Sequence, residues 1–265
     1  MSDTALPGST RNATSDLRQL RGHGFELELQ AGCGGRIVSL RHQGKDVLHP
    51  DTRPRDRNVL DAGCFPLVPF SNRIRNGEFS FGGKAYSLDS NWDGDAHAIH
   101  GEGWTSAWTV THQDDVSARL WMSGSGWWPW AYECSQMIRL APNKVILSLN
   151  VTNLDNRPMP AGLGFHPYFP HHPGTQLQFS ATGVIAPMGE RLAEIDPLTP
   201  KTDFSQLTDV DARDLDHGYA GWDGTATIHQ PGQAMEIAVR TSCAPAGTVV
   251  YTPPDLPFFC FEPVS

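Results

Sequence analysis

The chain has 265 residues, enough to bury a sizeable core as one large domain or two modest ones. Its formal net charge of -9 opposes phosphate backbones and anionic membrane surfaces, and no local run of basic residues compensates for it. Nucleic acid and membranes are therefore not expected as partners.

Turn-forming residues are abundant, with 26 glycines and 21 prolines. This composition requires a backbone that reverses often. No window of about 12 residues or more carries a clear apolar stripe with the helical period. We therefore predict an all-β fold with few, short helices.

The N-terminal residues 1–20 are polar and lack the apolar stretch of a signal peptide. We predict that they form a flexible segment and that 21–265 form a single domain, because no linker or fixed-period repeat divides them. No later window approaches the roughly 20 apolar residues of a membrane helix, so we expect a soluble, cytoplasmic protein.

The cysteines are odd in number and widely spaced, which suits reduced thiols packed in a core better than a disulfide framework or a zinc site. They are Cys33, Cys64, Cys134, Cys243 and Cys260.

Short runs with a two-residue period recur along the chain and predict strands. The first covers 25–30. A hairpin is predicted at 79–88 around Gly82-Gly83, and a strand at 145–151 follows a turn at 141–143. A second hairpin is predicted at 225–240 around Pro231-Gly232.

A carboxylate near the end of the chain stands out, because Glu262 follows five residues of apolar strand. Burial there raises the pKa of a carboxyl group and suits a general base. Aromatic neighbours Phe259, Phe261 and Tyr168 are the expected source of that burial. Glu262 could equally end the strand facing water or pair with an arginine.

Two histidines and an arginine lie in similar surroundings. His166 stands between aromatic residues and precedes a proline, and histidine is the usual proton carrier near neutral pH. His100 lies in a glycine-rich bend where backbone approaches a ligand closely. Arg73 is expected to share a strand face with Arg75, one binding substrate and the other a surface acid. His166 could instead be an ordinary core histidine that is hydrogen-bonded to a carbonyl.

Taken in order along the chain, these segments resemble the aldose 1-epimerase (galactose mutarotase) family. The matching segments are Phe65 to Ile74, Asn76 to Phe79, Ile99-His100-Gly101, Trp128-Pro129-Trp130, Met159 to Phe169 and Phe261-Glu262-Pro263. The resemblance implies a large antiparallel β-sandwich with the sugar site on a concave sheet face. It also implies a small sugar substrate and no metal or other cofactor.

The resemblance further implies roles for individual residues. Glu262 would be the general base that takes the anomeric proton, and His166 the general acid that protonates the ring oxygen. The sugar would be held by Arg73, His100 and Asn72, and also by Asp216. Asp214 lies two residues before Asp216, and both could be ordinary loop acids.

Three functions remain open. The first is a mutarotase for a free aldose. The second is a mutarotase for a hexose 6-phosphate, which needs a basic pocket that Arg73, Arg75 and Arg36 could supply. The third is a sugar-binding protein without turnover, because the chain ends at Ser265, sooner after Glu262 than is usual in the family. A metal-dependent hydrolase is disfavoured, because His97 with His100 and His171 with His172 lack a third ligand. Neither the particular sugar nor the oligomeric state follows from the sequence.

Overall fold

The computed structural model describes residues 16–52, 59–60, 62–185, 194–211, 213–242 and 246–265. Strands dominate these residues, and the helices among them are two 3-10 turns, η2 (Arg75–Gly77) and η3 (Pro231–Gln233). None of the helices in these ranges is long and apolar enough to cross a membrane. The prediction of an all-β fold with few, short helices is confirmed.

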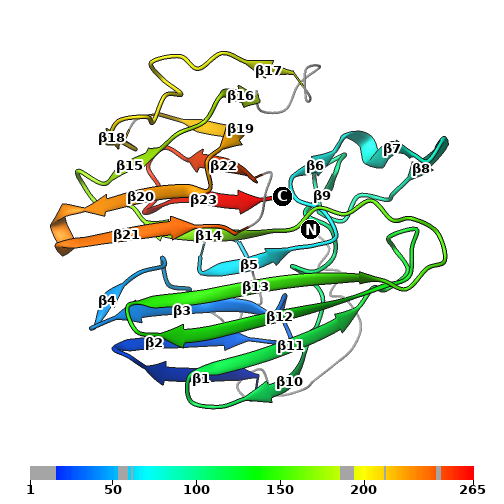
Figure 1. The fold of residues 1–265 in the computed structure, drawn as a ribbon, viewed down its shortest axis with the longest axis horizontal. Helices are drawn as coiled ribbons and strands as arrows, with labels where there is room; N and C mark the ends of the chain where they lie inside the picture. The colour runs from blue at the N-terminus through cyan, green and yellow to red at the C-terminus, as the bar shows by residue number, and fades with distance from the viewer. Residues whose placement is uncertain (1–15, 53–58, 61, 186–193, 212, 243–245) are drawn as a thin grey trace, which may run out of the picture.

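An 11-stranded antiparallel sheet forms the largest layer (Figure 1). Its strands lie in the order β1-β2-β3-β5-β14-β23-β22-β19-β16-β17, with β4 paired to β3. Segments from the beginning, middle and end of the chain therefore meet at β5, β14 and β23. The strands are β1 (Leu17–Gly22), β2 (Phe25–Gln30), β3 (Arg36–His42), β4 (Lys45–Asp46), β5 (Cys64–Leu67), β14 (Gly164–Pro170), β16 (Gly183–Ile185), β17 (Ile195–Asp196), β19 (Leu215–Trp222), β22 (Ala246–Thr252) and β23 (Phe258–Val264).

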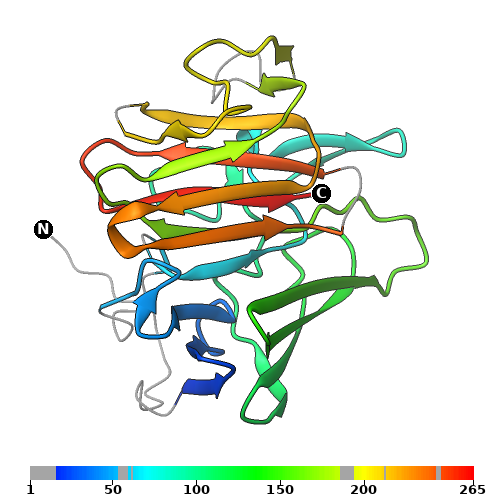
Figure 2. The same cartoon turned by 60° about the vertical axis from the view of Figure 1, so that its left-hand side comes forward.

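Two four-stranded sheets pack against this layer (Figures 1 and 2). One contains β10 (Thr109–Gln113), β11 (Ser117–Ser123), β12 (Tyr132–Ala141) and β13 (Lys144–Asn153). The other contains β15 (Gln176–Phe179), β18 (Thr208–Asp209), β20 (Thr225–Gln230) and β21 (Met235–Arg240). This arrangement confirms the predicted antiparallel β-sandwich.

The main core fills the space between these layers, and the two-residue period selects its members. Phe25, Leu27 and Leu29 of β2 are buried in it, whereas Glu26, which lies between Phe25 and Leu27, is exposed. Phe261 of β23 meets Phe179 of β15 with ring centroids 5.1 Å apart. Fully burying one such side chain contributes about 1.5–3 kcal/mol.

A second, smaller core lies on the opposite face of the large sheet. It includes Phe65, Trp104, Tyr168, Phe258 and Cys260, all buried. Because side chains alternate along a strand, Phe258 and Cys260 point to this face while Phe259 and Phe261 point into the main core. The large sheet is therefore covered by apolar side chains on both faces at its centre.

Two small ribbons lie at one end of the large sheet (Figure 1). β6 (Arg73–Ile74) pairs with β9 (Ala98–Ile99), and β7 (Glu78–Phe81) pairs with β8 (Lys84–Ser87). Phe79 of β7 stacks on Trp128 with the ring centroids 5.1 Å apart, which anchors this ribbon to the loop before β12.

Most of the predicted strands and turns are confirmed. The alternating runs form β2 and β13, and the two predicted hairpins are β7–β8 and β20–β21. The cysteines at 33, 64, 134 and 260 are buried free thiols, while Cys243 lies outside the described residues.

The predicted flexible segment is wrong at its C-terminal end. Leu17–Gly22 form β1, which pairs with β2 in a register that sets Leu20 opposite Leu27. Leu20 is fully buried in the main core, and this burial together with the backbone pairing to β2 orders a strand of otherwise polar composition. Residues 1–15 lie outside the described part of the chain.

Candidate active site

Two predicted site residues meet at the centre of the large sheet. β14 and β23 are antiparallel neighbours whose register pairs Tyr168 with Cys260, which places His166 opposite Glu262. On the other side of β14, His166 pairs with Phe65 of β5. Directly opposite residues share a face, so the imidazole and the carboxyl group lie side by side on the face opposite to the main core.

The two side chains are in contact and shielded from water. Nε2 of His166 lies 3.3 Å from Oε1 of Glu262. The exposed fractions of the two residues are 7% and 3%. Phe65 and Tyr168 contact the imidazole, with ring centroids 4.6 Å and 4.7 Å from it. The pair is therefore a buried acid–base couple with aromatic walls.

Two of the three aromatic neighbours expected around Glu262 are on the wrong side of the sheet. Phe259 and Phe261 pack into the main core. Successive side chains on a strand point to opposite faces, and these two residues are three and one positions from Glu262. Tyr168 does lie on the site face, where it packs in the second core with Cys260. The sheet itself and this second core therefore bury Glu262.

Burial shifts the pKa of each member of the couple toward its neutral form. It raises the pKa of Glu262 well above its ordinary value; the Asp216 carboxylate raises that pKa further, and the Arg73 guanidinium opposes the shift. Burial also lowers the pKa of the His166 imidazole. In the neutral state the couple holds one proton beyond the N–H of the neutral imidazole, and that proton is on the carboxyl group.

His100 approaches the couple from a different element. It follows β9, and its ring lies 5.4 Å from that of His166 in an edge-to-face arrangement. The backbone N–H of Asn72 donates to His100 Nδ1 at 3.2 Å. Burial, His166 and Arg73 lower the pKa of this imidazole, so it is neutral and carries its proton on Nε2.

Arg73 lies over the same face, held between two carboxylates. Its Nε donates to Oδ2 of Asp95 at 3.1 Å, and its Nη1 lies 4.0 Å from Oδ2 of Asp216. Asp216 on β19 pairs with Tyr251, which in turn pairs with Cys260, so Asp216 shares the face of Glu262. The guanidinium therefore links β6 to the far side of the site.

The structure also places three other residues considered in the sequence, Asn72, Arg75 and Asp214. Asn72 is exposed, and its Oδ1 accepts from the Arg73 N–H at 2.8 Å; its backbone contacts His100. Arg75 begins the η2 turn, so it does not share a strand face with Arg73 as predicted. The backbone turns after Ile74, which ends the period-two alternation. Asp214 is exposed and precedes β19.

Of the tryptophans near the motif segments, two are core residues. Trp222 packs on Phe261 in the main core, and Trp104 is 1% exposed against Phe65 in the second core. Trp92 differs, because it is 38% exposed and rests on Trp104 with ring centroids 5.3 Å apart. It offers a partly exposed aromatic face next to Trp104.

A buried carboxylate was not predicted from the sequence, although it stands two residues after His100. Glu102 is 7% exposed, and its Oε1 accepts from the Tyr132 hydroxyl at 2.6 Å. Its Oε2 accepts from the backbone N–H of Ser125 at 3.1 Å and from the Ser125 hydroxyl. Glu102 thus ties the turn that carries His100 to the sheet containing β12. An acidic residue between glycines carries no local signal of such burial.

Replacing Tyr132 with phenylalanine is expected to destabilise the fold by about 1–3 kcal/mol, because it removes a hydrogen-bond partner of a buried carboxylate. Urea unfolding followed by tryptophan fluorescence measures this loss. Tyr86→Phe is a suitable control, since Tyr86 is half-buried and stacks on Phe79. Equal unfolding free energies for Tyr132→Phe and wild type would contradict the assignment.

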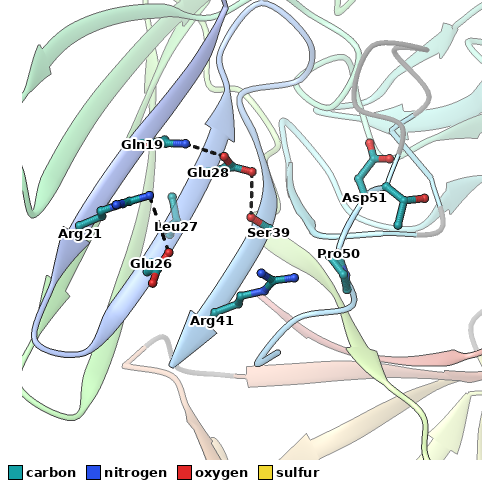
Figure 3. A pocket seen from close by; sticks show the side chains of 10 residues that line it. Gln19, Arg21, Glu26, Leu27, Glu28, Ser39, Arg41, Pro50 and Asp51 are labelled. Carbon is teal, nitrogen blue, oxygen red and sulfur yellow. Dashed lines mark hydrogen bonds and ion pairs between the residues drawn. The ribbon is translucent and has the colours of Figure 1, made fainter. Parts of the chain in front are cut away.

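A hollow of about 260 Å³ lies elsewhere, over β1, β2 and β3 (Figure 3). Its polar groups satisfy one another: Gln19 donates to Glu28 at 2.7 Å, Ser39 donates to Glu28 at 3.3 Å, and Arg21 pairs with Glu26. No histidine is among the side chains that line it. The buried couple of His166 and Glu262 is therefore not part of this hollow.

The fold and the site together define a class: an antiparallel β-sandwich protein with a buried imidazole–carboxyl couple at the centre of its largest sheet. The sequence model of the aldose 1-epimerase family matches residues 21–265. The chain belongs to this family.

The chain is also similar to a curated relative and to solved structures. The uncharacterized protein YphB of Escherichia coli K12 is 36% identical over 228 residues, which cover 82% of this chain and 78% of YphB. The crystal structure of a proposed aldose 1-epimerase from Escherichia coli K12 has a TM-score of 0.87 and 31% identity with this chain. The match covers 94% of this chain and 87% of that one. A galactose mutarotase-like protein from Clostridium acetobutylicum shares the fold, with a TM-score of 0.75 and 18% identity over 93% of this chain and 83% of its own.

Proposed function

We propose that this protein is an aldose 1-epimerase that interconverts the α and β anomers of a free aldose. The observation that carries the proposal is the 3.3 Å contact between Nε2 of His166 and Oε1 of Glu262, both buried. Family membership supports it.

The chemistry requires two coordinated proton transfers. A cyclic hemiacetal opens when its anomeric hydroxyl loses a proton and its ring oxygen gains one. The C1–O5 bond breaks, C1 becomes an aldehyde carbon, rotation about C1–C2 exposes its other face, and ring closure reverses both transfers. The two oxygens are bonded to the same carbon, so two proton carriers in contact with each other suit them.

In the proposed step Glu262 takes the anomeric proton while His166 donates a proton to the ring oxygen. This requires the carboxylate–imidazolium form, and one proton transfer across the 3.3 Å contact produces it from the neutral couple. In the reverse direction the two groups exchange roles. After one opening and one closure the couple has its original single proton.

Neighbouring groups would hold the sugar over the couple. His100 presents Nε2–H as a donor, Arg73 presents guanidinium N–H groups, and Asp216 presents a carboxylate acceptor on the same face. Asn72 supports this set by its backbone contact with His100. Donors and acceptors on one face suit a sugar, because each of its hydroxyl groups both donates and accepts hydrogen bonds.

The charges at the site favour a neutral sugar over a hexose 6-phosphate. Arg73 is already placed between Asp95 and Asp216, whose carboxylates would repel a phosphate. Arg36 is 1% exposed, and its Nη2 lies 2.7 Å from Oδ2 of Asp51. It therefore forms a buried ion pair and does not present its charge to a substrate. Competition between glucose and glucose 6-phosphate in the assay below distinguishes the two substrate classes.

Polarimetry or anomeric proton NMR on a panel of aldoses tests the proposal. We expect the protein to accelerate the approach to anomeric equilibrium for at least one free aldose. Binding of aldoses without any acceleration would instead identify a sugar-binding protein of the same fold.

The pH dependence gives a further prediction. The active couple holds one proton, so activity should fall at high pH as that proton is lost. Burial and, next to it, Asp216 raise the pKa of Glu262. Removing the Asp216 charge lowers that pKa, so Asp216→Asn should move the alkaline limb of kcat/KM to lower pH.

Asp214→Asn is the matched control, since Asp214 is exposed and lies two residues earlier. Its normalised profile should coincide with that of wild type. An alkaline limb that stays in place in Asp216→Asn would rule out the charge coupling between Asp216 and the couple.

A further inference from the structure

The turn that carries His100 has an unusual backbone. His100 has a φ of 59°, in the left-handed region that residues other than glycine seldom adopt. Its backbone N–H donates to the carbonyl of Asn72 at 2.9 Å, and its Nδ1 accepts from the Asn72 N–H at 3.2 Å. The direction of the Nε2–H therefore depends on a backbone conformation that needs support from its surroundings.

The side chain of Asn91 forms hydrogen bonds with the backbone on both sides of His100. Nδ2 of Asn91 donates to the carbonyl of Ile99 at 2.7 Å and to the carbonyl of Gly101 at 2.6 Å. Oδ1 of Asn91 accepts from the Ile99 N–H at 2.8 Å. The amide thus uses its nitrogen and its oxygen on backbone groups of the two residues that flank the histidine, Ile99 and Gly101.

Both carbonyl oxygens, of Ile99 and of Gly101, therefore accept from the same nitrogen, Nδ2 of Asn91. A relaxation of His100 to a negative φ would rotate the adjoining peptides and break this double contact. Asn91 does not act on the imidazole in any of these hydrogen bonds. Its effect on the ring therefore passes through the backbone.

We propose that Asn91 is a positioning residue that holds His100 in its left-handed conformation and so aims the Nε2–H at the sugar. The role of His100 as a sugar ligand rests on the proposed function. The role of Asn91 in fixing the turn rests on the three hydrogen bonds alone.

A double-mutant cycle tests the proposal. Asn91→Ala should raise KM for the aldose by about 5- to 100-fold with a smaller change in kcat, because it disturbs a group that binds the sugar. In a His100→Ala background the same substitution should change KM by less than about 2-fold. Asn91→Asp keeps the oxygen that accepts from Ile99 but sets a second oxygen against the two carbonyls, so it should behave like Asn91→Ala and provides the test if the alanine variant does not fold.

Ser90→Ala is the control for general loosening of this loop. The Ser90 hydroxyl donates to the carbonyls of Trp92 and Asp95 and does not contact the turn at His100. Its KM should equal that of wild type. A rise in KM as large as that in Asn91→Ala, or equal effects of Asn91→Ala in both backgrounds, would overturn the proposal.

A readout that does not need turnover separates this proposal from the proposed function. Nitrogen NMR of the ¹⁵N-histidine-labelled protein, with the His100 signals identified by their loss in His100→Ala, should show an Nε2-protonated ring in wild type. In Asn91→Ala and Asn91→Asp these signals should shift toward a mixture of tautomers. Unchanged His100 signals would refute the positioning role even if wild type proved to have no mutarotase activity.

Discussion

Replacing Glu262 with glutamine is expected to lower kcat for anomer interconversion by about 10²- to 10⁴-fold, the range typical of a lost general acid–base group. The amide has almost the same shape as the carboxyl group and can still contact His166 across the present 3.3 Å separation. It cannot accept the anomeric proton at neutral pH. Sugar binding should be largely retained, because the other groups on the face of the sheet are unchanged.

Progress curves from polarimetry measure kcat, and isothermal titration calorimetry measures the sugar affinity. Glu236→Gln on β21 is a matched control, since that carboxylate is exposed on another sheet. A Glu262→Gln protein with wild-type kcat would remove this carboxyl group from the mechanism. A loss of affinity without a loss of kcat would make it a binding group.

Replacing His166 with asparagine is expected to lower kcat by a similar factor, about 10²- to 10⁴-fold. Asparagine cannot carry a proton to the ring oxygen, and it leaves the buried Glu262 without its imidazole neighbour. Because the two side chains are in contact, their losses should not multiply. The double variant Glu262→Gln/His166→Asn should be no slower than the slower single variant by more than about 10-fold.

His171→Asn is the control, because His171 follows the end of β14 and pairs with Asp211. It should retain wild-type kcat. Fully multiplicative losses in the double variant would show that Glu262 and His166 act in separate steps, against the proposed coordinated transfer.

Five residues singled out from the motifs in the sequence lie close together in the structure. Glu262, His166, Arg73, His100 and Asp216 meet on one face or directly above it. Residue type was informative for Glu262, His166 and His100, which are polar groups in apolar or glycine-rich segments, whereas Asp216 was predicted from the family resemblance.

Supporting residues were not predictable in the same way. Asp95, Asn91 and Glu102 are ordinary polar residues in loops or turns. Asp95 accepts from Arg73, Asn91 contacts the residues on both sides of His100, and Glu102 ties the same turn to Ser125. Their partners are set by how β6, β9 and the neighbouring loops fold over the sheet. A loop sequence carries no period from which such partners can be inferred.

The burial of Glu262 shows the limit of local reasoning. Apolar neighbours correctly indicated a buried carboxyl group, but Phe259 and Phe261 next to it point into the main core. Adjacent residues on a strand face opposite ways, so sequence neighbours are the residues least able to surround a side chain.

The sequence by itself determined the all-β class, the hairpins at 79–88 and 225–240, and the kinds of side chain available for proton transfer, because turn chemistry and two-residue periodicity are local properties. Only the tertiary structure decided that β14 lies between β5 and β23 with His166 opposite Glu262. Strand order and register arise from non-local hydrogen bonds and from the packing of two faces at once. The contact between imidazole and carboxyl group exists because strands separated by almost a hundred residues became neighbours in that sheet.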